Sequence, residues 1–113
     1  MQILIVQFSL TIPVSDYERL AAELAPAFSA VPGLLSKAWL LDPASGEAGG
    51  VYLFADASFV DAYLASPLAP SADAPFLAGL RMQRYDAIEK ATSVTRGFLV
   101  ARPAVPARRT PFA

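Results

Sequence analysis

The stretch LLSKAWLLDPASGEAGGVYLFA, residues 34–55, decides the fold because it predicts two strands that fold back on each other. Two apolar runs, 34–41 and 49–55, flank the sequence Asp-Pro-Ala-Ser-Gly at 42–46. These residue types favour turns, and the spacing is that of a hairpin. We therefore expect an antiparallel strand pair near the centre of the chain.

The segment before the hairpin predicts a strand and then a helix. Residues 2–11 are rich in Ile, Leu, Val and Phe, with four apolar residues in succession, which indicates a strand buried on both faces. Ser15 and Glu18 have the spacing of a capping box, and apolar residues follow at helical spacing as far as the Pro-Gly pair at 32–33. Pro26 lies inside this helix and predicts a kink or a fresh start.

The segment after the hairpin predicts a second helix and a last strand. Asp56 is a candidate N-cap, the apolar residues that follow it share one helical face, and Ser-Pro at 66–67 ends the helix. Three prolines then indicate a loop that closes at Gly79, before a strand at 80–88. The resulting order, β-α-β-β-α-β, is the ferredoxin-like pattern of the α+β class, an antiparallel sheet with both helices on one face.

A second copy of the chain is expected to cover the other face of this sheet. The first strand needs apolar cover on both faces, and the two helices supply it on one only. A hydrophobic fraction of 55% is also more than a chain of 113 residues can hide inside itself. We therefore predict a homodimer in which the two sheets pack face to face.

The chain is expected to form one domain over residues 1–100, followed by a Pro- and Arg-rich tail at 101–113. Residues 94–100 could add one further strand. The tail is predicted to be mobile or to lie on the partner as an arm.

The composition argues against several classes of site and partner. The chain has no cysteine and no histidine, and its carboxylates do not have metal-ligand spacing, so we expect no disulfide, metal or haem and no cofactor. A net charge of -1 does not favour binding to nucleic acid, and no apolar run is long enough for a membrane span. A soluble, cytoplasmic protein is the expectation. Gly49 and Gly50 open a strand, so we interpret them as backbone clearance beside a packed neighbour and not as a nucleotide loop.

Strand alternation places a lysine among aromatic residues. Lys37 and Trp39 share one face of their strand, and Tyr52 and Phe54 share one face of the next. If the two faces coincide, they form an apolar pocket that stacks a flat ring, with Lys37, Tyr52 or Gln7 as polar contacts. The alternative is that these aromatic residues are simply core.

Lys37 needs either a carboxylate partner or an exit to solvent in both interpretations. Asp56 and Asp86 are candidate partners or bases, although each is also explained as a helix cap or a surface ion pair.

The sequence also resembles a known family. The run Lys-Ala-Trp at 37–39, the run EAGGVYLFAD at 47–56 and Ala-Tyr-Leu at 62–64 closely resemble the YdhR-like family of putative monooxygenases. Pro-Gly at 32–33 and Tyr-Asp at 85–86 fit as well, so the resemblance covers residue 2 to about residue 95, whereas the Pro-rich insert and the tail depart from it. The resemblance implies a dimeric α+β barrel.

For function, the resemblance implies a cofactor-independent monooxygenase that uses dioxygen on a small phenol, anthrone or quinol. Trp39 and Phe54 would wall the cavity, Lys37 would stabilise the substrate oxyanion, and Tyr52 or Gln7 would orient it. The candidate residues are Lys37, Trp39 and Tyr52 for catalysis and Gln7, Phe54, Tyr63 and Tyr85 for substrate binding. The alternatives are a cyclase or isomerase on the same fold and a non-catalytic dimer that binds a small ligand.

Overall fold

The predicted hairpin is present as β2 (Leu34–Asp42) and β3 (Glu47–Phe54) in the computed structural model, which describes residues 1–97. It is preceded and followed by the other described elements: β1 (Gln2–Leu10), α1 (Val14–Ser29), α2 (Ala57–Leu64), β4 (Leu77–Asp86) and α3 (Glu89–Val94). The predicted tail at 101–113 lies outside the described residues. No helix within the described part is long and apolar enough to cross a membrane.

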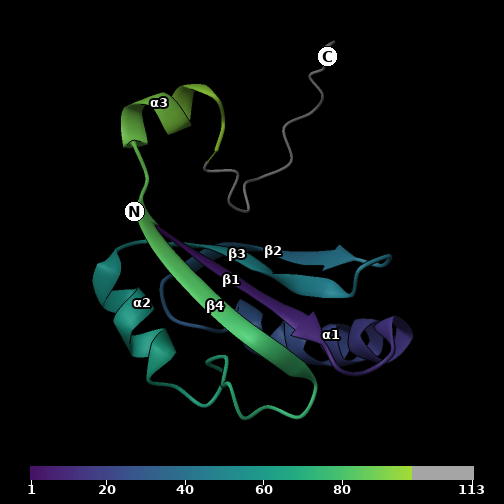
Figure 1. Ribbon diagram of the computed structural model, residues 1–113. Coiled ribbons are helices and arrows are strands. Elements are labelled where there is room, and N and C mark those ends of the chain that lie inside the picture. The colour runs from purple at the N-terminus through teal and green to yellow at the C-terminus, as the bar shows by residue number, and fades with distance from the viewer. Residues whose placement is uncertain (98–113) are drawn as a thin grey trace.

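The four strands form one antiparallel sheet in the order β2-β3-β1-β4. Figure 1 shows α1 and α2 on the same side of this sheet, with α3 beyond the end of β4 and away from them. This arrangement confirms the predicted α+β class and the ferredoxin-like order. β1 and β3 lie at the centre of the sheet because each pairs with a strand on both sides.

The strand register separates the two faces of the sheet. Leu4 of β1 pairs with Tyr52 of β3, and Tyr52 pairs with Lys37 of β2, so all three point to the face that α1 and α2 cover. Ile5 pairs with Val51, and both point to the opposite face, which we call the open face.

The core lies between the covered face and the two helices. Leu4, Val6, Phe54 and Val60 are fully buried. Burial of such side chains contributes about 1.5–3 kcal/mol each to stability. The remaining buried core is largely aromatic and includes residues of β1, α1, β3 and α2: Phe8, Tyr17, Phe28, Tyr52 and Tyr63.

The start of α2 agrees with the sequence, and the start of α1 does not. The Asp56 carboxylate accepts hydrogen bonds from the backbone N–H groups of Ser58 and Phe59 at 2.9 and 3.3 Å, as predicted for an N-cap. α1 begins one residue before Ser15, and the position before it is Pro13, with no side-chain cap. The predicted capping box is therefore wrong. The fixed φ of proline suits the start of a helix, even where no side chain caps it.

Pro26 lies within α1 and does not start a new helix, since α1 continues to Ser29. It falls in the last turn of the helix, where few later residues depend on its geometry. The Ser29 hydroxyl donates a hydrogen bond of 2.7 Å to the Pro26 carbonyl. The fresh start is therefore wrong, while the kink stays a prediction. The apolar stripe of α1 continues past Pro26, as expected, to Phe28, which is buried.

The last part of the described chain differs from the sequence prediction. β4 begins at Leu77 and passes through Gly79, which has a φ of +65° where the register with β1 shifts. Glycine permits such a bulge, so the strand begins three residues earlier than predicted. Val94 ends α3, and so the strand predicted at 94–100 is wrong for its described part.

Two adjacent glycines of β3 leave space for packed neighbours, and the first of them provides the backbone clearance that the sequence predicted. A Cβ on Gly49 would lie 1.9 Å from the Val6 carbonyl oxygen of β1. A Cβ on Gly50 would lie 3.0 Å from Lys37 Cε. Backbone approach explains the first glycine, and the second leaves space for the side chains of Lys37 and Tyr52.

We predict that Gly49→Ala lowers the free energy of unfolding by about 3 kcal/mol or more, because the new methyl group overlaps backbone atoms that cannot move without breaking the ladder. Gly46→Ala is the matched control, since Gly46 also has a positive φ but has nothing within 4 Å of an added Cβ. It should cost only the backbone strain, about 1–2 kcal/mol. Urea unfolding measures both values, and equal costs would contradict the assignment.

Candidate functional site

A cavity of about 290 Å³ lies between the covered face of the sheet, α1 and the loop that connects α2 to β4. Its lining is mostly aliphatic and aromatic. Val6 forms part of its floor on β1, Leu20 and Leu24 line it from α1, and Leu68 and Phe76 line it from the loop. A cavity of this size and composition is near the lower end of the range for small-molecule sites.

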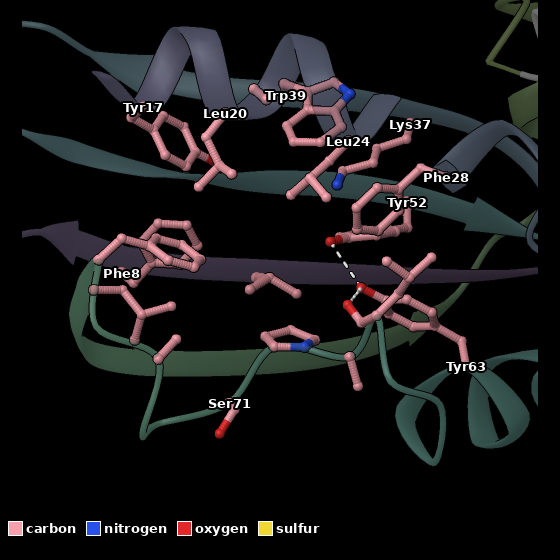
Figure 2. A pocket seen from close by; sticks show the side chains of 18 of the residues that line it. Phe8, Tyr17, Leu20, Leu24, Phe28, Lys37, Trp39, Tyr52, Tyr63 and Ser71 are labelled. Atoms are coloured by element: carbon pink, nitrogen blue, oxygen red, sulfur yellow. Dashed lines mark hydrogen bonds between the residues drawn. The ribbon is translucent and has the colours of Figure 1, made fainter. Parts of the chain in front are cut away.

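An aromatic cluster stands at each end of this cavity. At one end, Phe28 lies 5.2 Å from Trp39 in an edge-to-face arrangement and 6.2 Å from Tyr52, measured between ring centroids. At the other end, Phe8 lies 6.0 Å from Tyr17 and 5.9 Å from Phe76. Figure 2 shows the two groups well apart, with Leu20 and Leu24 between them.

Lys37 enters the first cluster from β2. Its Nζ lies 3.4 Å from the ring centroids of Phe28 and Trp39 and 4.5 Å from that of Tyr52. Figure 2 shows the amine pointing inward among these rings. No ion pair is found for Lys37 within residues 1–97, so its charge faces aromatic rings and not a carboxylate.

Burial lowers the pKa of Lys37 from its usual 10.5 to about 7. The ring faces act in the opposite direction, because their electron-rich faces attract the ammonium form. The amine is thus able to gain or lose a proton near neutral pH, at a half-buried position.

Tyr52 and Tyr63 bring two hydroxyl groups to the same end of the cavity. The hydroxyl oxygens are 3.2 Å apart, and that of Tyr63 is also 3.2 Å from the Leu68 carbonyl oxygen. A carbonyl can only accept, so both contacts are satisfied when Tyr63 donates to Leu68 and Tyr52 donates to Tyr63. Tyr52 Oη can then accept one further hydrogen bond from a ligand.

Burial raises the pKa values of both tyrosines above the usual range. Both hydroxyls therefore stay protonated at neutral pH, and Lys37 is the group at this end that titrates there.

The structure brings four of the seven predicted site residues to the cavity: Lys37, Trp39, Tyr52 and Tyr63. Phe54 lies on the same face but is fully buried, with its ring stacked 6.1 Å from that of Tyr52, and supports the cavity wall from behind. Gln7 and Tyr85 pair with residues of the open face and do not line this cavity.

The two candidate carboxylates do not reach Lys37. Asp56 caps α2, and Asp86 accepts a hydrogen bond of 2.9 Å from the Gln2 side chain. Within the described part of the chain, no three residues of the metal-ligating types His, Cys, Asp or Glu come together.

Sequence reasoning did not name the α1 and loop residues of the site. Tyr17 and Phe28 lie on the apolar stripe of α1, which is equally the pattern of a core-facing helix. Leu68 and Phe76 come from a proline-rich loop whose course over the cavity is not encoded in any periodicity.

Comparison with known proteins agrees with this fold. Residues 3–98 match the family model described as "Putative mono-oxygenase ydhR". Among solved structures, the chain is similar to a protein described as a putative antibiotic biosynthesis monooxygenase from Deinococcus radiodurans. The TM-score is 0.62 at 18% sequence identity, over 77% of this chain and 92% of that chain. At that identity the similarity concerns the fold. No match is found among curated proteins.

The lowered pKa of Lys37 predicts how stability depends on pH. Between about pH 7 and 10.5 the folded chain binds fewer protons at Lys37 than the unfolded chain does. Stability therefore rises with pH in that window. Lys37→Met removes this contribution, so wild-type stability relative to the variant should increase from pH 7 to pH 10 in urea unfolding. Lys90→Met, at an exposed position on α3, should follow the wild type. Parallel profiles for Lys37→Met and wild type would contradict the burial of the amine.

Proposed function

The chain belongs to the YdhR family of mono-oxygenases, and we propose that it oxidises a small, electron-rich aromatic compound in the cavity beside Lys37. The observation that carries the proposal is the Lys37 amine, held against three ring faces at the end of an apolar cavity. Such a site offers one titratable group and otherwise apolar or aromatic surface.

A flat ring system is the ligand that suits the lining. The walls are mostly aromatic and aliphatic, and the volume of about 290 Å³ has room for a few fused rings and not for a large ligand. Rings of this kind gain stability by edge-to-face and offset contacts with Trp39 and Phe28.

Lys37 would act on a phenol or enol oxygen of the substrate. As a neutral amine it accepts the proton of that group, and as an ammonium it then stabilises the oxyanion. A pKa of about 7 makes both forms available at neutral pH. Tyr52 Oη would accept a hydrogen bond from a neighbouring substrate hydroxyl and so orient the ring.

The anion formed in this way is the electron donor for dioxygen. One oxygen atom becomes bonded to a ring carbon conjugated with that oxyanion, and the other leaves as water with the hydrogen of this carbon and the proton that Lys37 accepted. The carbon is oxidised to a carbonyl and dioxygen is reduced, so the balance needs no separate reductant or added cofactor. The apolar walls support this step by keeping bulk water from the anion.

We also propose that the open face pairs with the open face of a second copy. The central strands present the half-buried side chains of Ile3, Ile5 and Val51 there, and α1 and α2 do not cover them. Glu47 lies towards one end of this face, where the Ser9 hydroxyl donates a hydrogen bond to it and Arg81 pairs with it at 2.7 Å. Apolar residues with a polar rim are the composition of a homodimer interface.

We predict that anthrones, quinols or phenols quench the emission of Trp39, the only tryptophan of the chain, in a saturable way. Ala21→Phe should weaken this binding at least about tenfold, because Ala21 lines the cavity and the larger ring occupies it. Ala22→Phe is the matched control on the exposed side of α1 and should bind as the wild type does. Equal binding by both variants would place the ligand elsewhere.

Ligands that bind should be consumed with uptake of dioxygen, and Lys37→Met should lower the rate about 100-fold if the amine acts as base and oxyanion partner. Turnover without dioxygen would identify a cyclase or isomerase instead. Saturable binding with no turnover would identify a non-catalytic ligand-binding protein. Either result would refute the oxygenase proposal.

The dimer proposal predicts that sedimentation equilibrium gives about twice the monomer mass for wild type at micromolar concentration. Ile5→Asp should reduce it to the monomer mass, because a charge would be buried in the interface without a partner. Ala22→Asp, on the exposed side of α1, should remain dimeric. A monomeric wild type would refute the proposal.

A further inference from the structure

Tyr17 brings a polar group to the end of the cavity that is remote from Lys37. Only 6% of Tyr17 is exposed, and its ring packs 6.0 Å from that of Phe8 and 6.1 Å from that of Phe76. Figure 2 shows the hydroxyl oxygen directed inward, beside Leu20. Within residues 1–97 this hydroxyl has no hydrogen bond. Its pKa is raised, and the cause is burial.

A buried hydroxyl without a partner is unusual, because nearly all buried polar groups in folded proteins are hydrogen-bonded. The contrast with the other end of the cavity is direct, since the Tyr63 hydroxyl lies 3.2 Å from both Tyr52 Oη and the Leu68 carbonyl oxygen. Packing does not require the Tyr17 oxygen, because a phenylalanine ring would make the same contacts with Phe8 and Phe76. The hydroxyl therefore has the properties of a group whose partner is a ligand.

The surfaces between the two ends define what that ligand can be. Leu20 and Leu24 line the cavity between Tyr17 and Lys37, and their side chains offer no polar atom. Polar groups in the middle of a ligand would lose their hydrogen bonds to water without replacement. A ligand that uses both ends thus has an apolar, flat centre.

We propose that Tyr17 Oη binds a second oxygen atom of the substrate, at the opposite end of the ring system from the oxygen that faces Lys37. This inference rests on the proposed ring-binding function and narrows its substrate class to fused-ring compounds with a hydroxyl or carbonyl at each end. Burial raises the pKa of Tyr17, so its hydroxyl stays protonated and can donate to either group.

Two naphthalene ligands of equal shape test the proposal through Trp39 emission. One is the diol with hydroxyls at opposite ends of the ring pair, and the other is the naphthol in which a methyl group replaces the far hydroxyl. Wild type should bind the diol roughly fivefold to tenfold more tightly, the effect of one additional buried hydrogen bond. In Tyr17→Phe this preference should disappear, while the affinity for the methyl compound stays the same.

Three other outcomes would overturn the proposal. No preference in wild type would show that Tyr17 makes no bond to the ligand, and an undiminished preference in Tyr17→Phe would assign the bond to another group. Failure of both ligands to bind would refute the proposed ring-binding function itself, and this inference with it.

Unfolding of the free variants supplies a readout that does not depend on any ligand. Tyr17→Phe should not lower the urea midpoint, because it removes an unpaired hydroxyl, whereas Tyr63→Phe should lower it, because two contacts are lost. A lower midpoint for Tyr17→Phe would reveal a structural partner for the hydroxyl and would contradict the proposal.

Discussion

The placement of one half-buried lysine amine among three aromatic rings is the constraint on which the site depends. Lys37 Nζ lies within 3.4 Å of two ring centroids, and within residues 1–97 it has no carboxylate partner. Loss of solvent lowers its pKa to about 7, and the rings partly compensate the buried charge. A lysine that is merely structural is more often paired or extended into solvent. On the proposed function, the cavity beside this amine binds the ring on which the amine acts.

The fold supplies this arrangement through the register of three strands. Tyr52 faces Lys37 across β2 and β3, and Gly50 leaves the space that the lysine side chain occupies. α1 then covers the sheet with Phe28 at one end of the cavity and Tyr17 at the other. As a result the two ends of the cavity differ. One end carries the Lys37 amine and the Tyr52 hydroxyl, which can accept a hydrogen bond. The other end carries the Tyr17 hydroxyl, which has no hydrogen-bond partner within residues 1–97. The proposed ligand would therefore bind in one preferred direction.

Much of this could be predicted from the sequence, and the reasons for the exceptions are physical. The hairpin at 34–55 and the element order follow from turn residues and from the pattern of apolar residues. Alternation left open whether Tyr52 shares the face of Lys37 and Trp39, and the register of β2 with β3 shows that it does. Gln7 and Tyr85 were predicted to bind substrate, but the register places them on the open face. The sequence of a strand indicates which of its residues share a face. Only strand pairing and the placement of the helices decide which face the helices cover.

Tyr17 and the loop residues of the cavity have a different explanation. A helical stripe that faces a cavity has the same periodicity as one that faces a packed core, so Tyr17 could not be separated from core residues. The contribution of Leu68 depends on the path of the loop, which proline positions do not determine. The start of β4 was displaced for a related reason, because Gly79 allows a bulge where a turn was expected.

The central claim is that Lys37 stabilises an oxyanion on a ring bound in this cavity, and the ionisation of a bound chromogenic nitrophenol tests it most directly. In wild type, absorbance should show that the bound phenol ionises at a lower pH than the free phenol, because the nearby ammonium favours the anion. In Lys37→Met the bound phenol should ionise at a higher pH than the free phenol, because only the apolar lining remains. The same pH dependence in both proteins would contradict the account.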